Sequence, residues 1–186
     1  MPPPKKAAKK AVKKAAKHHP DHHQASDLRR AYEHMSRVEI LQKSLKPSYA
    51  KAVTALAALA RQQLESGSNQ EAADLLRGSE HLSFAALAEE DSKKVQLSDV
   101  LVQSITEYFD EMIGRADEHW EGHEEGPGAL TAIYNSSRKN ATKAFRNGAY
   151  HRALEFARAA EALAHVKREG PHKLEQGKKA LKLAAQ

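Results

Sequence analysis

Apolar residues recur every three or four positions along most of the chain, as they do on one face of an amphipathic α-helix. The first such stretch follows Ser26-Asp27, a residue pair that favours a helix N-terminus. Five further stretches predict helices over residues 47–65, 70–88, 100–120, 129–146 and 150–167. Pro47, Gly67 and the glycine-rich segment 121–128 separate successive stretches, because proline and glycine end or redirect helices.

The composition agrees with an all-α fold. Ala, Leu, Glu and Lys, which favour helices, are abundant, and the Val/Ile/Thr alternation typical of strands is almost absent. We therefore predict a bundle of six to seven helices in residues 26–170, preceded by a disordered basic arm in 1–25 and followed by a short basic tail helix in 171–186. The pairs Asp110-Glu111 and Asp117-Glu118 are expected on the solvent-facing side of the helix over 100–120.

The bundle contains an internal repeat. One constant shift along the chain, which we call the repeat offset, carries Gly67 onto Gly148 and relates six pairs of identical residues. These pairs cover a helix end, a glycine turn and the next helix: Ala60/Ala141, Gly67/Gly148, Ala72/Ala153, Arg77/Arg158, Glu80/Glu161 and Leu82/Leu163. The Ser-Asp pairs at 26–27 and 98–99 align only if the second half has a longer loop. We expect two related three-helix units, residues 26–94 and 95–170.

The formal charge of +6 belongs to the N-terminal arm. Residues 1–23 contain seven lysines and one aspartate, so the rest of the chain is neutral as a whole. Within that remainder, residues 89–125 sum to −9 (3 basic, 12 acidic) and residues 126–186 sum to +8 (12 basic, 4 acidic). Charge segregated in this way indicates what the chain associates with, and says little about its fold.

Nucleic acid is the partner that the arm predicts. Lysines without acidic neighbours bind phosphate backbones by releasing counterions, without reading bases. The arm lysines are Lys5, Lys6, Lys9, Lys10, Lys13, Lys14 and Lys17. Their Lys-Lys-Ala-Ala pattern resembles the Lys/Ala-rich tails of linker histones and bacterial nucleoid proteins, which implies non-specific DNA binding. Two alternatives are a solubilising tail and an arm that folds back onto the acidic helix over 100–120.

A second basic group lies in the helix over 129–146. Lys139, Lys143 and Arg146 are spaced to share one face of that helix, as phosphate-contacting residues would. A solvated helix face is the alternative. The helical body would then provide contacts to a protein partner or to a second copy of the chain.

Several classes of protein are excluded by composition. Without cysteine there is no disulfide framework, thiolate zinc site or cysteine nucleophile. The longest apolar run, Ala55 to Ala60, is far shorter than the roughly 20 residues that span a bilayer. The N-terminus lacks the apolar core of a secretory signal, so we expect a cytoplasmic protein, including association with the nucleoid, and no membrane partner.

Histidines provide the only candidate metal ligands. His119 and His123 are four residues apart, a spacing that presents two imidazoles on one side of a helix, although Gly122 lies between them. The tract His18, His19, His22 and His23 would hold nickel or zinc only loosely. Glu-x-x-His occurs once, from Glu169 to His172, whereas a di-iron carboxylate bundle needs two such pairs. The chain has no His-Glu-x-x-His motif and no glycine-rich phosphate loop, so no cofactor is expected.

Gly148-x-Tyr150-x-x-Ala153, with Ala141 before it and Ala160 after it, resembles the helix–turn–helix core of a tetratricopeptide repeat. In that family small residues allow two antiparallel helices to approach closely, and stacked hairpins form a partner-binding surface. The repeat offset of this chain is more than twice the family's period of about 34 residues. The resemblance therefore implies one such hairpin, not an array.

The same segment also resembles the HEPN domain, a helical bundle of prokaryotic nucleotide-binding proteins and ribonucleases. The residues that carry this resemblance are Gly148-Ala149-Tyr150, Ala153, Phe156-Ala157 and Ala159-Ala160-Glu161, with His172-x-Leu174 later. HEPN ribonucleases use an Arg and a His four to six residues apart, and Arg158 and His165 have six residues between them. The resemblance implies RNA cleavage or nucleotide binding, whereas the charge pattern favours a non-enzymatic nucleic-acid-binding protein.

Overall fold

The computed structural model describes residues 20–88, 97–121 and 128–166. In these ranges the chain forms helices joined by short turns and has no strand, which confirms the all-α prediction. The helices are α2 (Pro20–Leu41), the short 3₁₀ helix η1 (Gln42–Ser44), α3 (Pro47–Glu65), α4 (Asn69–Leu87), α5 (Asp99–Glu121), α6 (Gly128–Arg146) and α7 (Tyr150–Ala164). The predicted arm lysines and the predicted tail helix over 171–186 lie outside the described residues.

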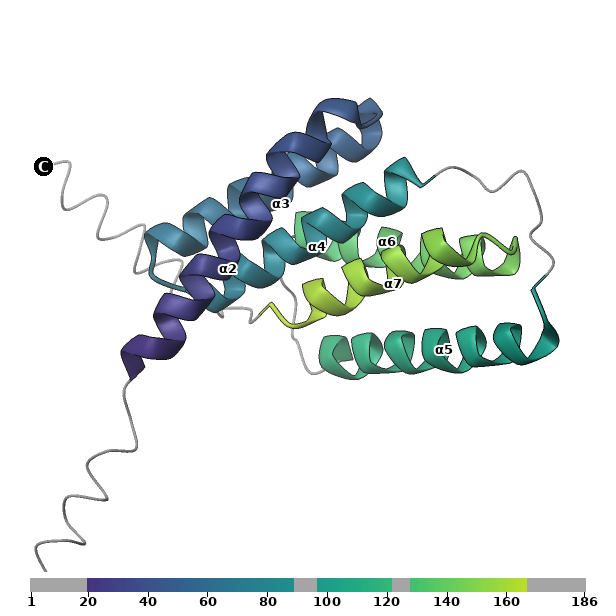
Figure 1. Ribbon diagram of the computed structural model, residues 1–186. Helices are drawn as coiled ribbons and strands as arrows, with labels where there is room; N and C mark the ends of the chain where they lie inside the picture. The colour runs from purple at the N-terminus through teal and green to yellow at the C-terminus, as the bar shows by residue number, and fades with distance from the viewer. Residues whose placement is uncertain (1–19, 89–96, 122–127, 167–186) are drawn as a thin grey trace, which may run out of the picture.

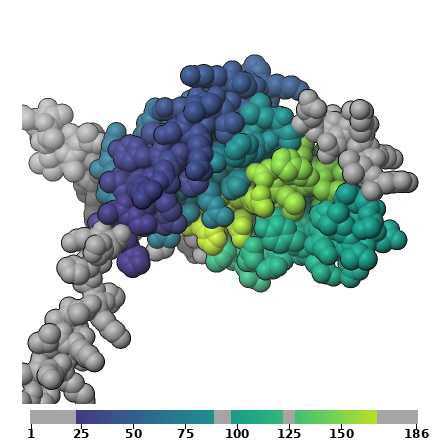
Figure 2. All heavy atoms as spheres, viewed as in Figure 1, coloured from purple at the N-terminus to yellow at the C-terminus, as the bar shows by residue number. Residues whose placement is uncertain are grey.

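Helices α4 and α7 form the centre of the bundle (Figure 1). Helices α2 and α3 pack on α4, and α5 and α6 pack on α7. Gly78 contacts Leu163 while His81 contacts Glu155, so α4 and α7 run antiparallel. In the space-filling view, α7 is visible as a band between α4 and α5 (Figure 2).

Small residues allow the central helices to approach closely. Ala153, Ala157 and Ala160 of α7 are fully buried, as a helix packed on three neighbours requires. A Cβ atom added at Gly78 would lie 2.7 Å from Cδ2 of Leu163, closer than van der Waals contact permits. The contact between the two halves of the molecule therefore depends on the absence of a side chain at Gly78.

The helix boundaries agree with the internal repeat. The repeat offset carries Pro47–Glu65 onto Gly128–Arg146, and the first residue of α4 onto the first residue of α7. The turns between these helices contain Gly67 with φ 79° and Gly148 with φ 76°. Positive φ is the conformation that glycine adopts without strain at a helix C-terminus. The two hairpins α3–α4 and α6–α7 therefore have matching helix bounds and the same glycine turn under the repeat offset.

The predicted start of the first helix is wrong. Helix α2 begins at Pro20, within the segment 1–25 assigned to the arm, and passes through Ser26-Asp27. Proline is well tolerated at the first helical position because no intrahelical bond needs its N–H there. With this start, α2 has 22 residues and α5 has 23. The longer loop invoked to align the two Ser-Asp pairs is therefore unnecessary.

One further helix boundary differs from the prediction. Helix α7 ends at Ala164, before the predicted end at Lys167. Tyr108 of α5 is 41% exposed, whereas Phe109 and Met112 are buried as their spacing suggests. Among the described helices, none combines the length and the apolar character needed to cross a membrane.

Candidate functional site

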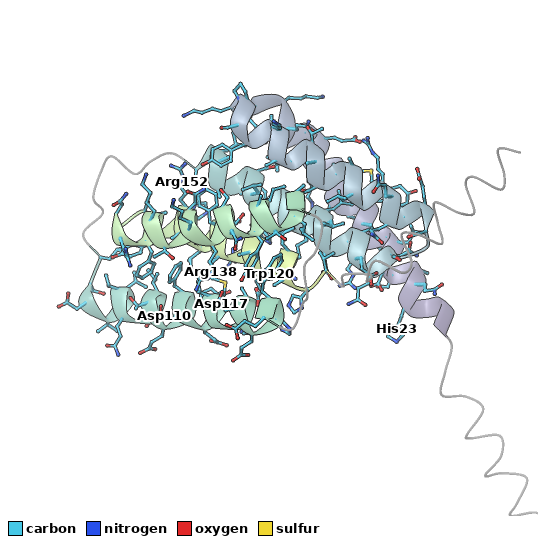
Figure 3. The ribbon with its side chains drawn as sticks, turned by 180° about the vertical axis from the view of Figure 1, so that it is seen from behind. His23, Asp110, Asp117, Trp120, Arg138 and Arg152 are labelled. Carbon is cyan, nitrogen blue, oxygen red and sulfur yellow. The ribbon has the colours of Figure 1, made fainter. Side chains whose placement is uncertain are left out.

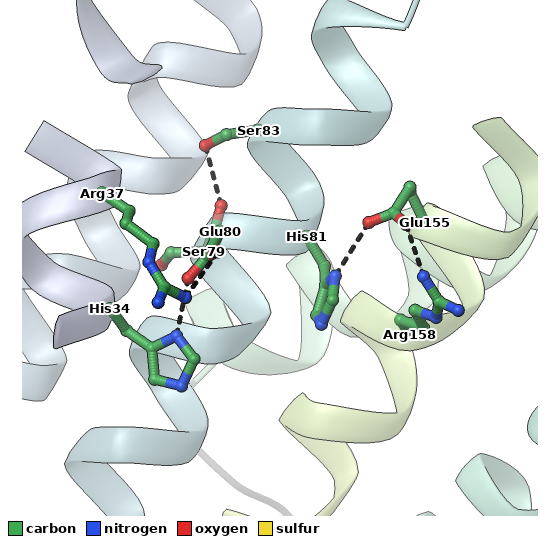
Figure 4. Close-up of polar contacts among 8 residues, drawn as sticks. All are labelled: His34, Arg37, Ser79, Glu80, His81, Ser83, Glu155 and Arg158. Carbon is green, nitrogen blue, oxygen red and sulfur yellow. Dashed lines mark hydrogen bonds and ion pairs between the residues drawn. The ribbon is translucent and has the colours of Figure 1, made fainter. Parts of the chain in front are cut away.

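A buried carboxylate joins the two halves of the bundle. Glu155 of α7 is 5% exposed, and its Oε2 lies 2.8 Å from His81 Nδ1 of α4 (Figure 4). Its Oε1 accepts a hydrogen bond of 2.7 Å from Arg158. Burial alone raises the pKa of Glu155, but the hydrogen bonds and charges of His81 and Arg158 outweigh burial and lower the pKa below its usual value.

Two further carboxylates hold the outer helices to the central ones. Glu80 of α4 pairs with His34 of α2 at 2.6 Å and with Arg37 at 3.3 Å (Figure 4). Glu161 of α7 pairs with Arg115 of α5 at 2.9 Å. Because the repeat offset relates Glu80 to Glu161 and position 34 to position 115, both halves use this contact at the same place.

Asp117 of α5 forms polar contacts to α6. It accepts two hydrogen bonds of 2.6 Å from Arg138 and one of 3.0 Å from the Tyr134 hydroxyl. The hydrogen bond from Arg138 lowers the pKa of Asp117, and the Trp120 ring stacks on Tyr134 at 3.7 Å (Figure 3). Asp117 is only partly exposed because Arg138 approaches it from α6, whereas Asp110, Glu111 and Glu118 are exposed, as predicted for the solvent-facing side of this helix.

The structure places Arg158 and His165 in different contacts. Arg158 pairs with Glu155, whereas His165, at the C-terminal end of α7, packs against His119 with ring centroids 4.2 Å apart. Burial, followed by the charge of His119, lowers the pKa of His165. The contact between His119 and His165 links α5 to α7 and was not predicted, since the two residues lie far apart in the sequence.

The predicted metal pair is only half described. His119 lies in α5, and His123 lies outside the described residues. Within the described ranges, no group of three or more His, Asp or Glu side chains is arranged to hold a metal ion. Within the described residues, His119 contacts His165.

Lys139, Lys143 and Arg146 lie on the C-terminal half of α6, and all three are exposed. No salt bridge joins them to an acidic residue of the described part of the chain, whereas Arg115, Arg138 and Arg158 are each paired with a carboxylate. The predicted grouping of these three cations on one exposed helix segment agrees with their positions in α6.

A cavity of about 510 Å³ lies where α3, α6 and α7 meet. Its lining residues are Tyr49, Asn140, Lys143, Ala144, Asn147, Ala149, Arg152 and Phe156. A neighbouring cavity of about 340 Å³ between α3 and α6 shares Tyr49 and Asn140 with it. Of the residues predicted to bind nucleic acid, Lys143 lines the larger cavity.

Arg152 reaches this cavity from the first turn of α7 (Figure 3). Its Nη2 donates to the Tyr49 hydroxyl at 3.4 Å, and its guanidinium carbon lies 5.7 Å from the centre of the Phe156 ring. A guanidinium over an aromatic face is held in orientation by cation–π attraction. No local sequence pattern pointed to this arrangement, because Tyr49 and Arg152 are 103 residues apart.

Comparison with known proteins yields no match: no family model, curated protein or solved structure resembles this chain closely enough to be assigned to it. The tetratricopeptide and HEPN resemblances therefore stay predictions. The residues that carry the tetratricopeptide resemblance lie in the α6–α7 hairpin. There Ala141, Ala153 and Ala160 are fully buried, and Gly148 has positive φ.

Proposed function

We propose that this chain is a non-enzymatic nucleic-acid-binding protein that contacts the phosphate backbone through its lysine arm and through α6. The observation that carries the proposal is the cluster Lys139, Lys143 and Arg146, exposed on one helix segment without a carboxylate partner in the described part of the chain. Cations that are not neutralised within the protein are available to replace the counterions of a polyanion.

The magnitude of the salt dependence follows from the number of cations. If the seven arm lysines contact duplex DNA, the slope of log affinity against log salt concentration is about −6, and three further contacts from α6 bring it to about −9. The arm therefore contributes most of the affinity. The contribution of α6 is smaller, but it comes from a rigid helix and fixes how the body lies against the backbone.

The test is a salt titration of duplex DNA binding by the full-length chain. We compare the wild type with a variant in which all seven arm lysines are Gln, and with a Lys139→Gln, Lys143→Gln, Arg146→Gln variant. The matched control replaces Lys43, Lys46 and Lys51, three exposed lysines that lie in η1, before α3 and in α3. This control removes the same total positive charge as the α6 variant, but its three lysines do not lie on one helix segment.

We expect the slope to become less steep by about 6 for the arm variant and by about 3 for the α6 variant. The control should leave the slope nearly unchanged. An unchanged slope in the arm variant would contradict the role of the arm. Equal effects of the α6 variant and the control would contradict a specific role for α6.

RNA cleavage through Arg158 and His165 is the second candidate function. The lowered pKa of His165 favours its neutral imidazole, the form that accepts a proton from a ribose hydroxyl. The pairing of Arg158 with Glu155 reduces the positive charge available for a phosphate. RNA cleavage by the full-length chain that is lost in His165→Ala, with helicity retained, would replace the first proposal by this one.

A further inference from the structure

We propose that the smaller cavity, of about 340 Å³ between α3 and α6, holds an unpaired nucleobase of a strand whose phosphates lie along the C-terminal half of α6. The proposal rests on the proposed function, in which the cations of α6 contact the phosphate backbone. It adds the class of nucleic acid, a strand with unpaired bases, and a discrete site for one base.

The lining of this cavity combines apolar surface with hydroxyl and amide groups. The apolar lining residues are Ala52, Leu82, Ala132 and Ile133. The polar lining residues are Ser48, Tyr49, Ser136, Ser137 and Asn140. An unpaired base presents flat faces that stack on apolar and aromatic groups, and edges that form hydrogen bonds. The two kinds of lining therefore match the two kinds of surface that a base offers.

Asn140 is placed to recognise the edge of a base. Its amide donates a hydrogen bond of 3.4 Å to the Ser136 hydroxyl, and a side-chain amide has a second N–H donor and a carbonyl acceptor besides. Asn140 is half-buried and Ser136 is exposed, so a ligand that enters from solvent reaches this pair. An amide that offers a donor and an acceptor side by side pairs well with a base edge.

Tyr49 lines the cavity with a ring whose orientation is fixed. Its hydroxyl accepts a hydrogen bond of 3.4 Å from Arg152, and its ring packs on Phe156 with ring centroids 6.2 Å apart. A base that stacks on a ring already held in place costs less entropy than one that must order the ring first. Tyr49 therefore supplies a stacking surface before the ligand arrives.

The cations of α6 lie next to the cavity on the same helix. Lys139 directly precedes Asn140, and Lys143 follows Asn140 by three residues, a rise of about 4.5 Å along the helix. Arg146 lies about 9 Å along the helix from Asn140. A strand with one base in the cavity can therefore pass its neighbouring phosphates along these cations, as single-strand binding proteins combine stacking with backbone contacts.

The polar lining is specific to one side of each helix pair in the repeat. Under the repeat offset the corresponding residues are Ser136/Ala55, Asn140/Leu59 and Tyr49/Leu130. Leu59 packs against the core, and Leu130 is buried. The equivalent positions thus carry apolar side chains, which shows that the hairpin forms without these hydroxyl and amide groups. Exchanging the residues at equivalent positions removes the site with side chains that the fold already accommodates.

The test compares a single-stranded DNA with an abasic strand of the same length and charge, by fluorescence anisotropy at one salt concentration. Both strands are measured on the full-length chain whose arm lysines are Gln, so that the arm does not dominate binding. We expect the strand with bases to bind about tenfold more tightly, as one base–aromatic contact provides. Duplex DNA should gain nothing from the cavity, because its bases are paired.

Two independent variants remove the site without changing the charge of the chain. Asn140→Leu with Ser136→Ala, and separately Tyr49→Leu, should each abolish the preference for the strand with bases. Neither should change the slope of log affinity against log salt concentration, since that slope counts phosphate contacts. Asn135→Leu, at an exposed residue of α6 that does not line the cavity, is the matched control and should keep the preference. Circular dichroism checks that each variant remains helical.

The outcomes separate this proposal from backbone binding. Equal affinity for the two strands overturns the cavity proposal alone if the duplex slope still depends on α6. A preference that Asn140→Leu with Ser136→Ala leaves intact also overturns it, and absence of binding to any strand overturns both proposals. Adenosine monophosphate is the second probe. If it binds and Asn140→Leu with Ser136→Ala removes that binding, while the strands show no preference, the ligand is a free nucleotide and the strand is overturned.

Discussion

Asp74 of α4 and Glu155 of α7 occupy equivalent positions in the two halves, but their pKa values shift in opposite directions. Burial raises the pKa of Asp74 to about 6, and the charge of Arg77 only partly offsets it. Burial acts on Glu155 as well, but His81 and Arg158 lower its pKa. The difference shows that one fold position favours or disfavours a charged carboxylate according to the partner that the neighbouring helix supplies.

The opposite pKa shifts arise because some contacts recur under the repeat offset and others do not. The contact between an outer helix and a central helix exists twice, as His34 with Glu80 and as Arg115 with Glu161. The contact between the central helices is made by His81 and Glu155, and the residue corresponding to His81 in the second half is Ala162. Alanine has no donor for Asp74, so the two halves are alike in backbone and unlike in charge pairing.

The largest expected effect comes from removing Glu155. Glu155→Ala leaves His81 and Arg158 without their shared carboxylate, and the free energy of unfolding should fall by about 3 kcal/mol at neutral pH. Because the folded-state pKa of Glu155 is lowered, this contribution is present above its usual value of 4.5 and is lost as the pH falls further. Urea denaturation at several pH values measures it.

Glu80→Ala is the matched control for that variant. Its partner Arg37 is 56% exposed and stays hydrated when the carboxylate is lost, so the destabilisation should be smaller. Equal losses for Glu80→Ala and Glu155→Ala would contradict the importance of the contact between the central helices.

The next effect tests the approach of α4 to α7. Gly78→Leu places side-chain atoms where Leu163 already lies, and should destabilise the fold by about 1–3 kcal/mol. Gly114→Leu in α5 is the control, since nothing lies within 4 Å of an added Cβ there and leucine favours the helix. Thermal denaturation of both variants is the measurement, and a stabilised Gly78→Leu would refute the close approach of the two helices.

A smaller effect of opposite sign is expected at Asp74. Asp74→Asn should stabilise the fold by about 1–2 kcal/mol at pH 7, because it removes a buried charge that the folded state disfavours. The folded pKa of about 6 lies above the usual 3.8, so the wild type regains this stability as the pH falls between these values. The two proteins should therefore be equally stable below about pH 4, as denaturation curves at each pH will show.

The smallest effect concerns the contrast between the acidic α5 and the basic α6. Asp110 and Glu118 are exposed residues of α5 that compete with nucleic acid for the lysine arm if the arm folds back. Asp110→Asn with Glu118→Gln should then raise DNA affinity about twofold at low salt and not at high salt, since salt screens exposed charges. Affinity that is unchanged at low salt would exclude this competition.

Local sequence signals located most of the helices. Pro47, Gly67 and Gly148 end or begin helices as predicted, because proline restricts φ and glycine adopts positive φ. The start of α2 at Pro20 was not predicted, because Ser26-Asp27 is itself a pair that favours a helix N-terminus. The larger cavity was less predictable, since Lys143 carried a sequence signal and Tyr49 and Arg152 did not.

The sequence by itself determined the all-α fold, the matching bounds of the two hairpins and the separation of charge between α5 and α6. These features depend on residues three or four positions apart and on turn residues, so the chain specifies them locally. Only the tertiary structure decided that His81 pairs with Glu155, that Asp117 meets Arg138, and that Arg152 reaches the cavity beside Tyr49. Packing of α4 on α7 brings such residues together, and helical periodicity contains no information about a partner on another helix.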